Sequence, residues 1–261
     1  MDIAARATSF EEIIRWRDGY RLEMGCQIIH DSIHSRARWT DEYHLLMDGV
    51  PVGYGSIAVG GPWKETPTVY EFYVVPHHRL HLFELFQTLL SASGAVTIEA
   101  QSNDPVASAM IHTFAGQVTG EAILFHDRVR TSHQIPGAIF REPTVKEAQD
   151  VPLDQLKWRG VIEIEGRVAA TGGILFHYNR PYGDIYMEVM EPFRRRGLGS
   201  FLVQELKRVC YEGGHVPAAR CNTKNIASRR TLQKAGFVPC GHLLKGVVQT
   251  DSGSPPHGEP G

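Results

Sequence analysis

Three arginines and two glycines lie together in the second half of the chain, and their order indicates a phosphate-binding turn. The sequence there reads Arg194-Arg195-Arg196-Gly197-Leu198-Gly199. The first turn of a helix has unpaired backbone N–H groups and the positive end of the helix dipole, and glycines let a pyrophosphate approach them. Cations at a helix N-terminus are otherwise unfavourable, so the arginines indicate a bound anion beside the turn. A solvated basic turn is the alternative.

The elements that position this turn can be read from periodicity. A strand-like run over residues 185–190 precedes it, and an apolar helical stripe follows, ending at Gly213-Gly214. The stripe recurs at spacings of three and four residues and consists of Leu198, Phe201, Leu202, Leu206, Val209 and Cys210. The turn therefore lies between a strand and an amphipathic helix.

This order of parts resembles the GNAT superfamily of acyl-CoA-dependent N-acetyltransferases. The acetyl-CoA loop of that superfamily has Gln or Arg, then Gly three residues later, then Gly or Ala two residues later, and Arg194, Gly197 and Gly199 fill these positions. A second stretch, residues 225–237, resembles the later superfamily segment in which Asn is followed three residues on by Ala or Ser and a short helix ends in Gly-Phe. The resemblance covers about residues 161–246.

The resemblance implies that acetyl-CoA is the co-substrate. The loop would hold the CoA pyrophosphate, with the Ser200 hydroxyl as an additional ligand, while Asn225 and Ser228 would flank the pantetheine arm. The full predicted set of CoA-binding residues is Val189, Met190, Arg194, Arg195, Arg196, Gly197, Leu198, Gly199, Ser200, Asn225 and Ser228.

Direct acetyl transfer to an amine also requires an oxyanion donor and a base. A backbone N–H near Val189 and Met190 would polarise the thioester oxygen, as it does in relatives. An ordinary lysine amine has a pKa of about 10.4, so a base is expected for such an acceptor. Glu188 is the first candidate, with Tyr186 on the same strand face; a solvent-facing or structurally paired carboxylate is the alternative. His177 is the second candidate base.

One position departs from the superfamily pattern. Many relatives have a tyrosine seven residues after the asparagine, which protonates the departing thiolate, and here that position is Leu232. Tyr186, Ser228 or water would have to replace it.

Composition limits the other classes of function. The chain has 261 residues, 42% hydrophobic content and a net charge of −2, which gives no general attraction to nucleic acid or to an anionic membrane. No apolar run is long enough to span a bilayer, and the four cysteines lack metal or disulfide spacing, so a cytoplasmic protein is expected. No metal site is expected either, although His77, His78 and His81 lie close together in the sequence.

The first half of the chain is predicted to be a divergent copy of the second; the alternative is that two α/β domains share turn chemistry by chance. Asp48-Gly49 and Glu165-Gly166 align at an offset of 117 (165 minus 48), Pro76 and Pro192 at 116 (192 minus 76), and Ala107 and Ala227 at 120 (227 minus 107). The two loop glycines become His81 and Phe83 in the first copy, and Pro105 replaces the asparagine. The first copy is therefore not expected to bind CoA.

The predicted fold is α/β, with two tandem GNAT-like domains, each a mixed, mostly antiparallel sheet flanked by helices. Residues 1–138 would form the divergent domain, 139–246 the catalytic domain and 247–261 a flexible tail. In the first domain the expected helices are 9–18, 21–34, 79–92 and 106–114, and the expected strands are 43–47, 52–59, 68–75, 95–100 and 121–126. In the second, strands are expected over 160–165, 169–177, 184–190 and 218–222 and from 237 onward, with a short helix near 145–149.

The predicted function is N-acetyl transfer from acetyl-CoA to a primary amine of a small molecule or peptide. The two domains would form an internal pseudo-dimer in which the inactive half shapes the acceptor cleft. The sequence does not identify the acceptor or the oligomeric state. A non-catalytic acyl-CoA-binding regulatory or scaffolding module is the alternative.

Overall fold

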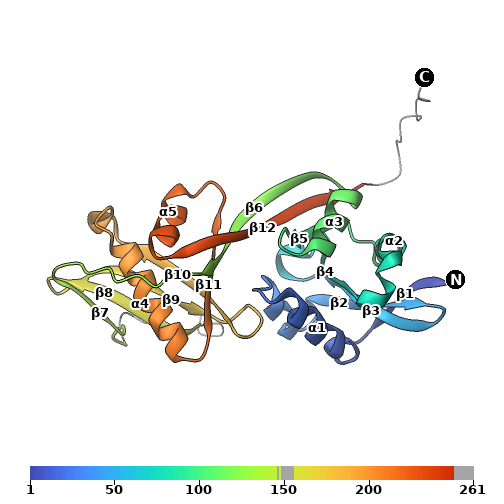
Figure 1. Cartoon of the computed structure of the whole chain (residues 1–261), viewed down its shortest axis with the longest axis horizontal. Helices are drawn as coiled ribbons and strands as arrows, with labels where there is room; N and C mark the ends of the chain where they lie inside the picture. Colours follow the sequence, from blue (N-terminus) through green and yellow to red (C-terminus); the bar gives the residue numbers. More distant parts are fainter. Residues whose placement is uncertain (146, 148–155, 250–261) are drawn as a thin grey trace, which may run out of the picture.

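The computed structural model describes residues 1–145, 147 and 156–249, and its strands form one continuous twisted sheet (Figure 1). The strand order of this 12-stranded sheet is β1-β2-β3-β4-β5-β12-β6-β11-β10-β9-β8-β7. Strand pairing is antiparallel except in the pairs β4–β5 and β10–β11. The predicted mixed, mostly antiparallel sheet is thus confirmed, with the difference that one sheet serves both halves.

The first half follows the predicted order of elements. These are β1 (Ile3–Thr8), α1 (Phe10–Met24), β2 (Thr40–Met47), β3 (Val50–Ala58), β4 (Thr68–Val74), α2 (Leu82–Ser93), β5 (Thr97–Gln101), α3 (Pro105–Phe114) and β6 (Ala115–Asp127). The sequence analysis missed β1, which pairs with β2 at the edge of the sheet.

The two predicted opening helices are one helix, α1, and the prediction of a helix over 21–34 was wrong beyond residue 24. Gly19 lies inside α1, where a Cβ would stand 3.3 Å from the Tyr73 hydroxyl, so the helix can pack closely there. The helix ends at Gly25, which has a left-handed φ of 57°. The N–H groups of Ile28 and Ile29 then donate to side chains elsewhere in the fold rather than to helix carbonyls, and only a short 3₁₀ turn, Asp31–Ser35, follows.

The second half repeats this order except that no helix among the described residues corresponds to α1. Its elements are β7 (Ala138–Arg141), β8 (Leu156–Ile164), β9 (Arg167–Leu175), β10 (Tyr182–Val189), α4 (Leu198–Glu212), β11 (Val216–Asn222), α5 (Ile226–Lys234) and β12 (Phe237–Val248). The predicted helix near 145–149 lies largely outside the described residues. The first two residues of the predicted tail, 247 and 248, belong to β12, and residues 250–261 lie outside the described residues.

The last strand of each half is paired inside the other half. Strand β12 lies between β5 and β6, with Leu243 opposite Gln101 and Phe237 opposite Asp127. Strand β6 in turn pairs with β11, where Cys221 lies opposite Ile123. Figure 1 shows these two long strands crossing the centre of the molecule. The boundary near residue 138 stays a prediction, because each half contributes one strand to the sheet of the other.

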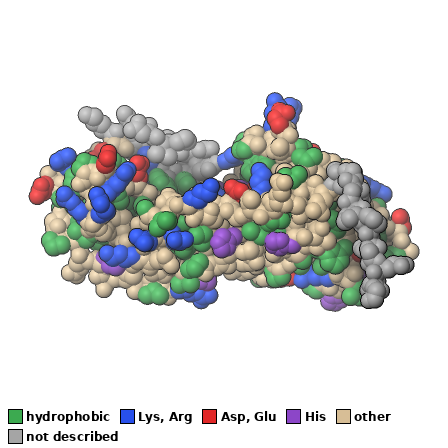
Figure 2. Space-filling view, turned by 90° about the horizontal axis from the view of Figure 1, so that it is seen from above, with side chains coloured by type: hydrophobic (Ala, Val, Ile, Leu, Met, Phe, Trp, Pro, Cys, Tyr) green, Lys and Arg blue, Asp and Glu red, His purple; other side chains and the backbone are tan. Residues whose placement is uncertain are grey.

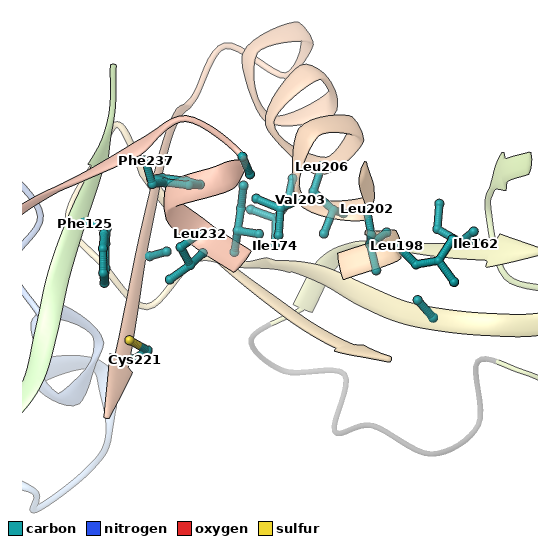
Figure 3. Close-up of a cluster of buried hydrophobic side chains, with 14 of the residues drawn as sticks. Phe125, Ile162, Ile174, Leu198, Leu202, Val203, Leu206, Cys221, Leu232 and Phe237 are labelled. Atoms are coloured by element: carbon teal, nitrogen blue, oxygen red, sulfur yellow. The ribbon is translucent and has the colours of Figure 1, made fainter. Parts of the chain in front are cut away.

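Helices α2 to α5 cover one face of the sheet. In the second half, Leu198, Leu202 and Leu206 of α4 are at most 1% exposed and pack on β9 to β11 together with Leu232 of α5 (Figure 3). Burying each such leucine contributes about 1.5–3 kcal/mol. Helix α1 packs on the opposite face, where Ile13 contacts the tyrosines of β3 and β4. Within the described residues, no helix is both long enough and apolar enough to cross a membrane.

Candidate functional site

Strands β10 and β11 separate soon after they begin, which opens a gap in the sheet. They pair only from Tyr182 with Val216 to Asp184 with Ala218, and β10 continues to Val189 without a partner on that side. The counterpart pair β4–β5 separates after two residue pairs in the same way. Parallel strands that separate leave backbone N–H and C=O groups unpaired on their facing edges. The gap leads toward the N-terminus of α4.

The open edge of β10 supplies one of the two predicted oxyanion donors. The Met190 N–H donates to Ala169 O at 2.9 Å, so it is engaged with β9 and unavailable to a ligand. Successive residues of a strand direct their polar groups to opposite sides, so the Val189 N–H faces the gap. The Val189 carbonyl faces the same side and accepts a hydrogen bond from Arg194 Nε at 3.1 Å.

The start of α4 has the geometry expected of an anion site. Gly197 is the N-cap, with a left-handed φ of 81°, and Arg195 also has a positive φ of 63°. The first helical hydrogen bond runs from Phe201 N to Gly197 O at 3.1 Å. The preceding N–H groups, those of Leu198 to Ser200, have no acceptor among the described residues. These donors and the helix dipole together suit a pyrophosphate.

At two of the predicted CoA-binding residues, Gly199 and Ser200, the side-chain direction points into the protein rather than toward a ligand. A Cβ on Gly199 would stand 3.0 Å from Thr231 Cγ2 and 3.4 Å from Val189 Cγ2, so this glycine lets α4 pack against α5 and β10. The buried Ser200 hydroxyl donates to Thr231 O at 3.3 Å, a partner that differs from the CoA contact predicted for it. The backbone N–H groups of both residues have no acceptor among the described residues and are available to a ligand.

Basic side chains surround this turn on the outside. Arg194, Arg195 and Arg196 are exposed, and Lys234 of α5 places its Nζ 3.6 Å from where a Cβ on Gly197 would stand. No carboxylate pairs with these four side chains in the part of the chain that the structure describes. Figure 2 shows basic side chains gathered over the end of the molecule that carries α4 and α5. The sequence analysis did not assign Lys234, although it lies within the quoted second motif.

Asn225 has a structural role in the free protein. Its Oδ1 accepts the Ser228 N–H at 3.0 Å and so caps α5, which leaves the amide nitrogen for a ligand. Asp104 caps α3 in the same way by accepting the Ala107 N–H at 3.0 Å. The counterpart of Asn225 in the first half is therefore Asp104 and not Pro105, because the true offset at this point is 121 (225 minus 104).

The two predicted catalytic side chains share the face of β10 away from α4. Tyr186 lies over Gly173 of β9, where a Cβ would be 3.0 Å from its hydroxyl. Burial raises the pKa of the Tyr186 phenol, and the nearby Arg159 charge opposes this only in part, so the hydroxyl stays protonated. Glu188 is exposed and lies opposite Thr171. Its position is open to an acceptor as well as to solvent.

Leu232 is part of the hydrophobic core. Its side chain is 3% exposed and points from α5 toward the sheet (Figure 3). This packing explains why an apolar residue is accommodated there, and it gives the site no proton donor at this position.

A second set of polar side chains lies where β10 and β11 part. His177 Nε2 is 2.8 Å from Asp184 Oδ2, and Arg220 Nε is 3.8 Å from the same oxygen. His177 follows β9, Asp184 lies on β10 and Arg220 on β11, so the topology brings them together. The sequence analysis named His177 but gave no signal for its two partners, which are 7 and 43 residues away (184 minus 177 and 220 minus 177).

The first half has a corresponding arrangement of strand, turn and helix, but different side chains lie at the turn. Arg79 Nε donates to Val74 O at 2.9 Å, as Arg194 does to Val189, but its guanidinium also forms two hydrogen bonds to Glu23. His81 takes the place of the N-cap glycine, and the Phe83 ring is 51% exposed and 6.4 Å from that of Phe114. The paired arginine and the bulky side chains are unfavourable for a phosphate.

Comparison with known proteins supports the same class. Residues 134–237 match the profile of the acetyltransferase (GNAT) family. No curated protein matches the sequence. Among solved structures, an acetyltransferase of the GNAT family from Colwellia psychrerythraea is similar with a TM-score of 0.72 at 12% identity, over 95% of this chain and 100% of that one.

Two further structures are similar over nearly the whole chain. A tandem GNAT protein from the clavulanic acid biosynthesis pathway has a TM-score of 0.61 at 13% identity, covering 96% of this chain and 99% of its own. A GCN5-related N-acetyltransferase from Sphaerobacter thermophilus has a TM-score of 0.58 at 14% identity, covering 95% and 96%. At these identities the likeness establishes the fold.

The molecule therefore has a tandem GNAT fold, in which two copies of one unit share a sheet. Residues 134–237 match the GNAT family profile, and members of that family typically transfer acyl groups from acyl-CoA. These matched residues contain the arginine-glycine turn, β10, β11 and α5.

Proposed function

We propose that this protein transfers an acetyl group from acetyl-CoA to a primary amine, using the site between β10, β11 and α4. The observation that carries the proposal is the unpaired edge of β10 leading to the unpaired N–H groups at the start of α4. In this proposal Leu198 to Ser200 hold the pyrophosphate through backbone N–H groups, and Arg195, Arg196 and Lys234 add positive charge. Asn225 and Ser228 line the other side of the gap.

The chemistry is the attack of a neutral amine on the thioester carbonyl. The new C–N bond forms as the C–S bond breaks, the amine loses a proton to a base, and the CoA sulfur takes up a proton. The Val189 N–H would stabilise the negative charge that develops on the carbonyl oxygen. Glu188 and His177 are the two candidate bases on this side of the sheet, and the protonated Tyr186 hydroxyl is the candidate donor to the sulfur.

The buried Leu232 favours one alternative function. A protein that holds acyl-CoA but lacks a proton donor at that position would serve as an acyl-CoA-binding regulatory or scaffolding module. In the proposed enzyme, Tyr186, Ser228 or water replaces the missing tyrosine.

Release of CoA thiol separates the two functions. We expect acetyl-CoA to raise the unfolding temperature and a panel of primary amines to give thiol release above the rate without amine. Stabilisation by acetyl-CoA with no amine-dependent thiol release would favour the binding module. Failure of acetyl-CoA to stabilise the protein at millimolar concentration would contradict both.

A further inference from the structure

A small pocket lies between the two halves, on the sheet face away from α4. It has a volume of about 180 Å³. The first half contributes Arg36, Trp39 and Trp63 to its lining, and the second half contributes His177 and Arg220. Neither half could form this pocket alone.

The pocket lies where β10 and β11 separate. Asp184 and Ala218 form the last pair between the two strands, and Arg220 is two residues further along β11, which is about 6.6 Å at the usual rise per residue. Ala218 packs against Ile29 of the first half, whereas its neighbour Ala219 packs in the cluster under α4. Arg220 therefore shares the face of Ala218, which is also the face of the two predicted catalytic side chains.

The lining is basic and aromatic. Its ten described residues include two arginines and two histidines and no Asp or Glu. The Arg36 guanidinium stacks on the Trp39 ring at 4.3 Å. Arg220 lies 5.9 Å from the Tyr178 ring, and its Nε forms an ion pair with Asp184 Oδ2 at 3.8 Å, which leaves its two terminal nitrogens without a carboxylate among the described residues. Stacked guanidinium groups keep their N–H edges free, and these edges match carboxylates and phosphates.

His177 adds a candidate proton acceptor at the same place. Its Nε2 faces Asp184 Oδ2 at 2.8 Å, and Nδ1 has no hydrogen-bond partner among the described residues. A carboxylate on one ring nitrogen fixes the orientation of an imidazole and leaves the other nitrogen for proton exchange.

We propose that the acceptor is a small amine with an anionic group, and that this group binds between Arg36 and Arg220. The inference rests on the proposed function and names the class of its acceptor. The volume is below the 300–1,000 Å³ of most ligand sites, so the pocket holds the anionic end and a short stem rather than a peptide. A carboxylate and a phosphate share this chemistry, and the test separates them.

The test measures acceptor binding without turnover. The tryptophan emission is titrated in the presence of CoA with ω-amino carboxylates of two to six carbons, with matched ω-amino phosphonates and with matched carboxamides. We expect one anionic series to change the emission and the carboxamides to leave it unchanged, with Trp39→Phe reducing the response. Equal affinity for an ω-amino carboxylate or phosphonate and for the matched carboxamide would refute the proposal.

Arginine variants locate the binding. Arg36→Gln and Arg220→Gln should each raise the Kd of the best anionic amine at least tenfold, whereas Arg38→Gln, an exposed neighbour outside the pocket, should leave it unchanged. Arg220→Lys keeps the charge and should recover part of the affinity, which separates charge loss from misfolding. An unchanged Kd in folded Arg36→Gln and Arg220→Gln proteins would overturn the proposal.

Thiol release keeps this inference distinct from the proposed function. Anionic amines that bind through both arginines without releasing thiol would support the pocket and contradict acetyl transfer. Neutral amines that release thiol equally in wild type and in both arginine variants would support acetyl transfer and contradict the pocket.

Discussion

Gly236 is the glycine at the end of the second motif, and replacing it with alanine is expected to destabilise the fold strongly. Its φ is 90°, and a Cβ would stand 2.0 Å from the Val129 carbonyl oxygen. A left-handed backbone costs an L-residue about 1–2 kcal/mol. The clash would also displace the oxygen that accepts a hydrogen bond from Lys207 Nζ at 2.8 Å, a bond to a charged group worth about 1.5–3 kcal/mol.

The two contributions give an expected loss of about 2.5–5 kcal/mol in the free energy of unfolding for Gly236→Ala. Gly214 is the matched control, because its φ is 74° and nothing lies within 4 Å of where its Cβ would stand. Gly214→Ala should therefore cost only the backbone contribution of about 1–2 kcal/mol. The difference between the two variants isolates the clash with Val129.

Urea unfolding followed by circular dichroism measures both variants. A loss of about 2.5–5 kcal/mol corresponds to a decrease of about 5–20 °C in Tm for a chain of this size. Equal losses in Gly236→Ala and Gly214→Ala would refute the reasoning, since they would show that the linker after β6 moves away at no cost.

Further variants test the site and the buried charges. Arg194→Gln should raise the Kd of acetyl-CoA several-fold, as measured by calorimetry. The counterpart variant Arg79→Gln should leave this Kd unchanged, because the Glu23 carboxylate already pairs with Arg79. An equal rise in Kd in both variants would contradict an anion site confined to the second half. Either Glu188→Gln or His177→Gln is expected to remove the base, and that variant should lower kcat about 10²-fold or more without changing the affinity for acetyl-CoA. If both variants retain the wild-type kcat, neither residue is the base. Burial opposes the charged form of Glu99, but hydrogen bonds and charge from His30 lower its pKa to about 2. The ionised carboxylate therefore stabilises the fold above its unfolded pKa of about 4.3, and this stabilisation is lost as the pH falls toward 2. Glu99→Gln should lower the free energy of unfolding by on the order of 3 kcal/mol at pH 7 and by progressively less on acidification. A difference between wild type and variant in urea unfolding that does not change with pH would contradict this.

The features that could be predicted from the sequence are those that depend on residues close together along the chain. The turn from Arg194 to Gly199 begins a helix after a strand, and periodicity is sufficient to locate such elements within a few residues. The duplication was also visible, because repeated turns and strands leave collinear signals. The continuity of α1 was missed, and the structure shows that Gly19 inside it lets the helix approach Tyr73 closely.

The individual roles of the loop residues needed the tertiary structure. Gly199 was interpreted as room for a phosphate, and its Cβ position in fact faces Thr231 and Val189. Met190 was a candidate oxyanion donor, and strand register engages its N–H with Ala169. These outcomes depend on which neighbour lies across a strand or helix, and such contacts join residues far apart in sequence.

By itself the sequence determined the class of fold, the repeat and the position of the arginine-glycine turn before α4, since each depends on local periodicity and on a few residue types at short spacing. Only the tertiary structure decided that β6 and β12 are exchanged between the halves. It also decided that Arg36 of the first half and Arg220 of the second line one pocket. Strand pairing and the approach of side chains across a sheet are non-local, and no pattern along the chain specifies them.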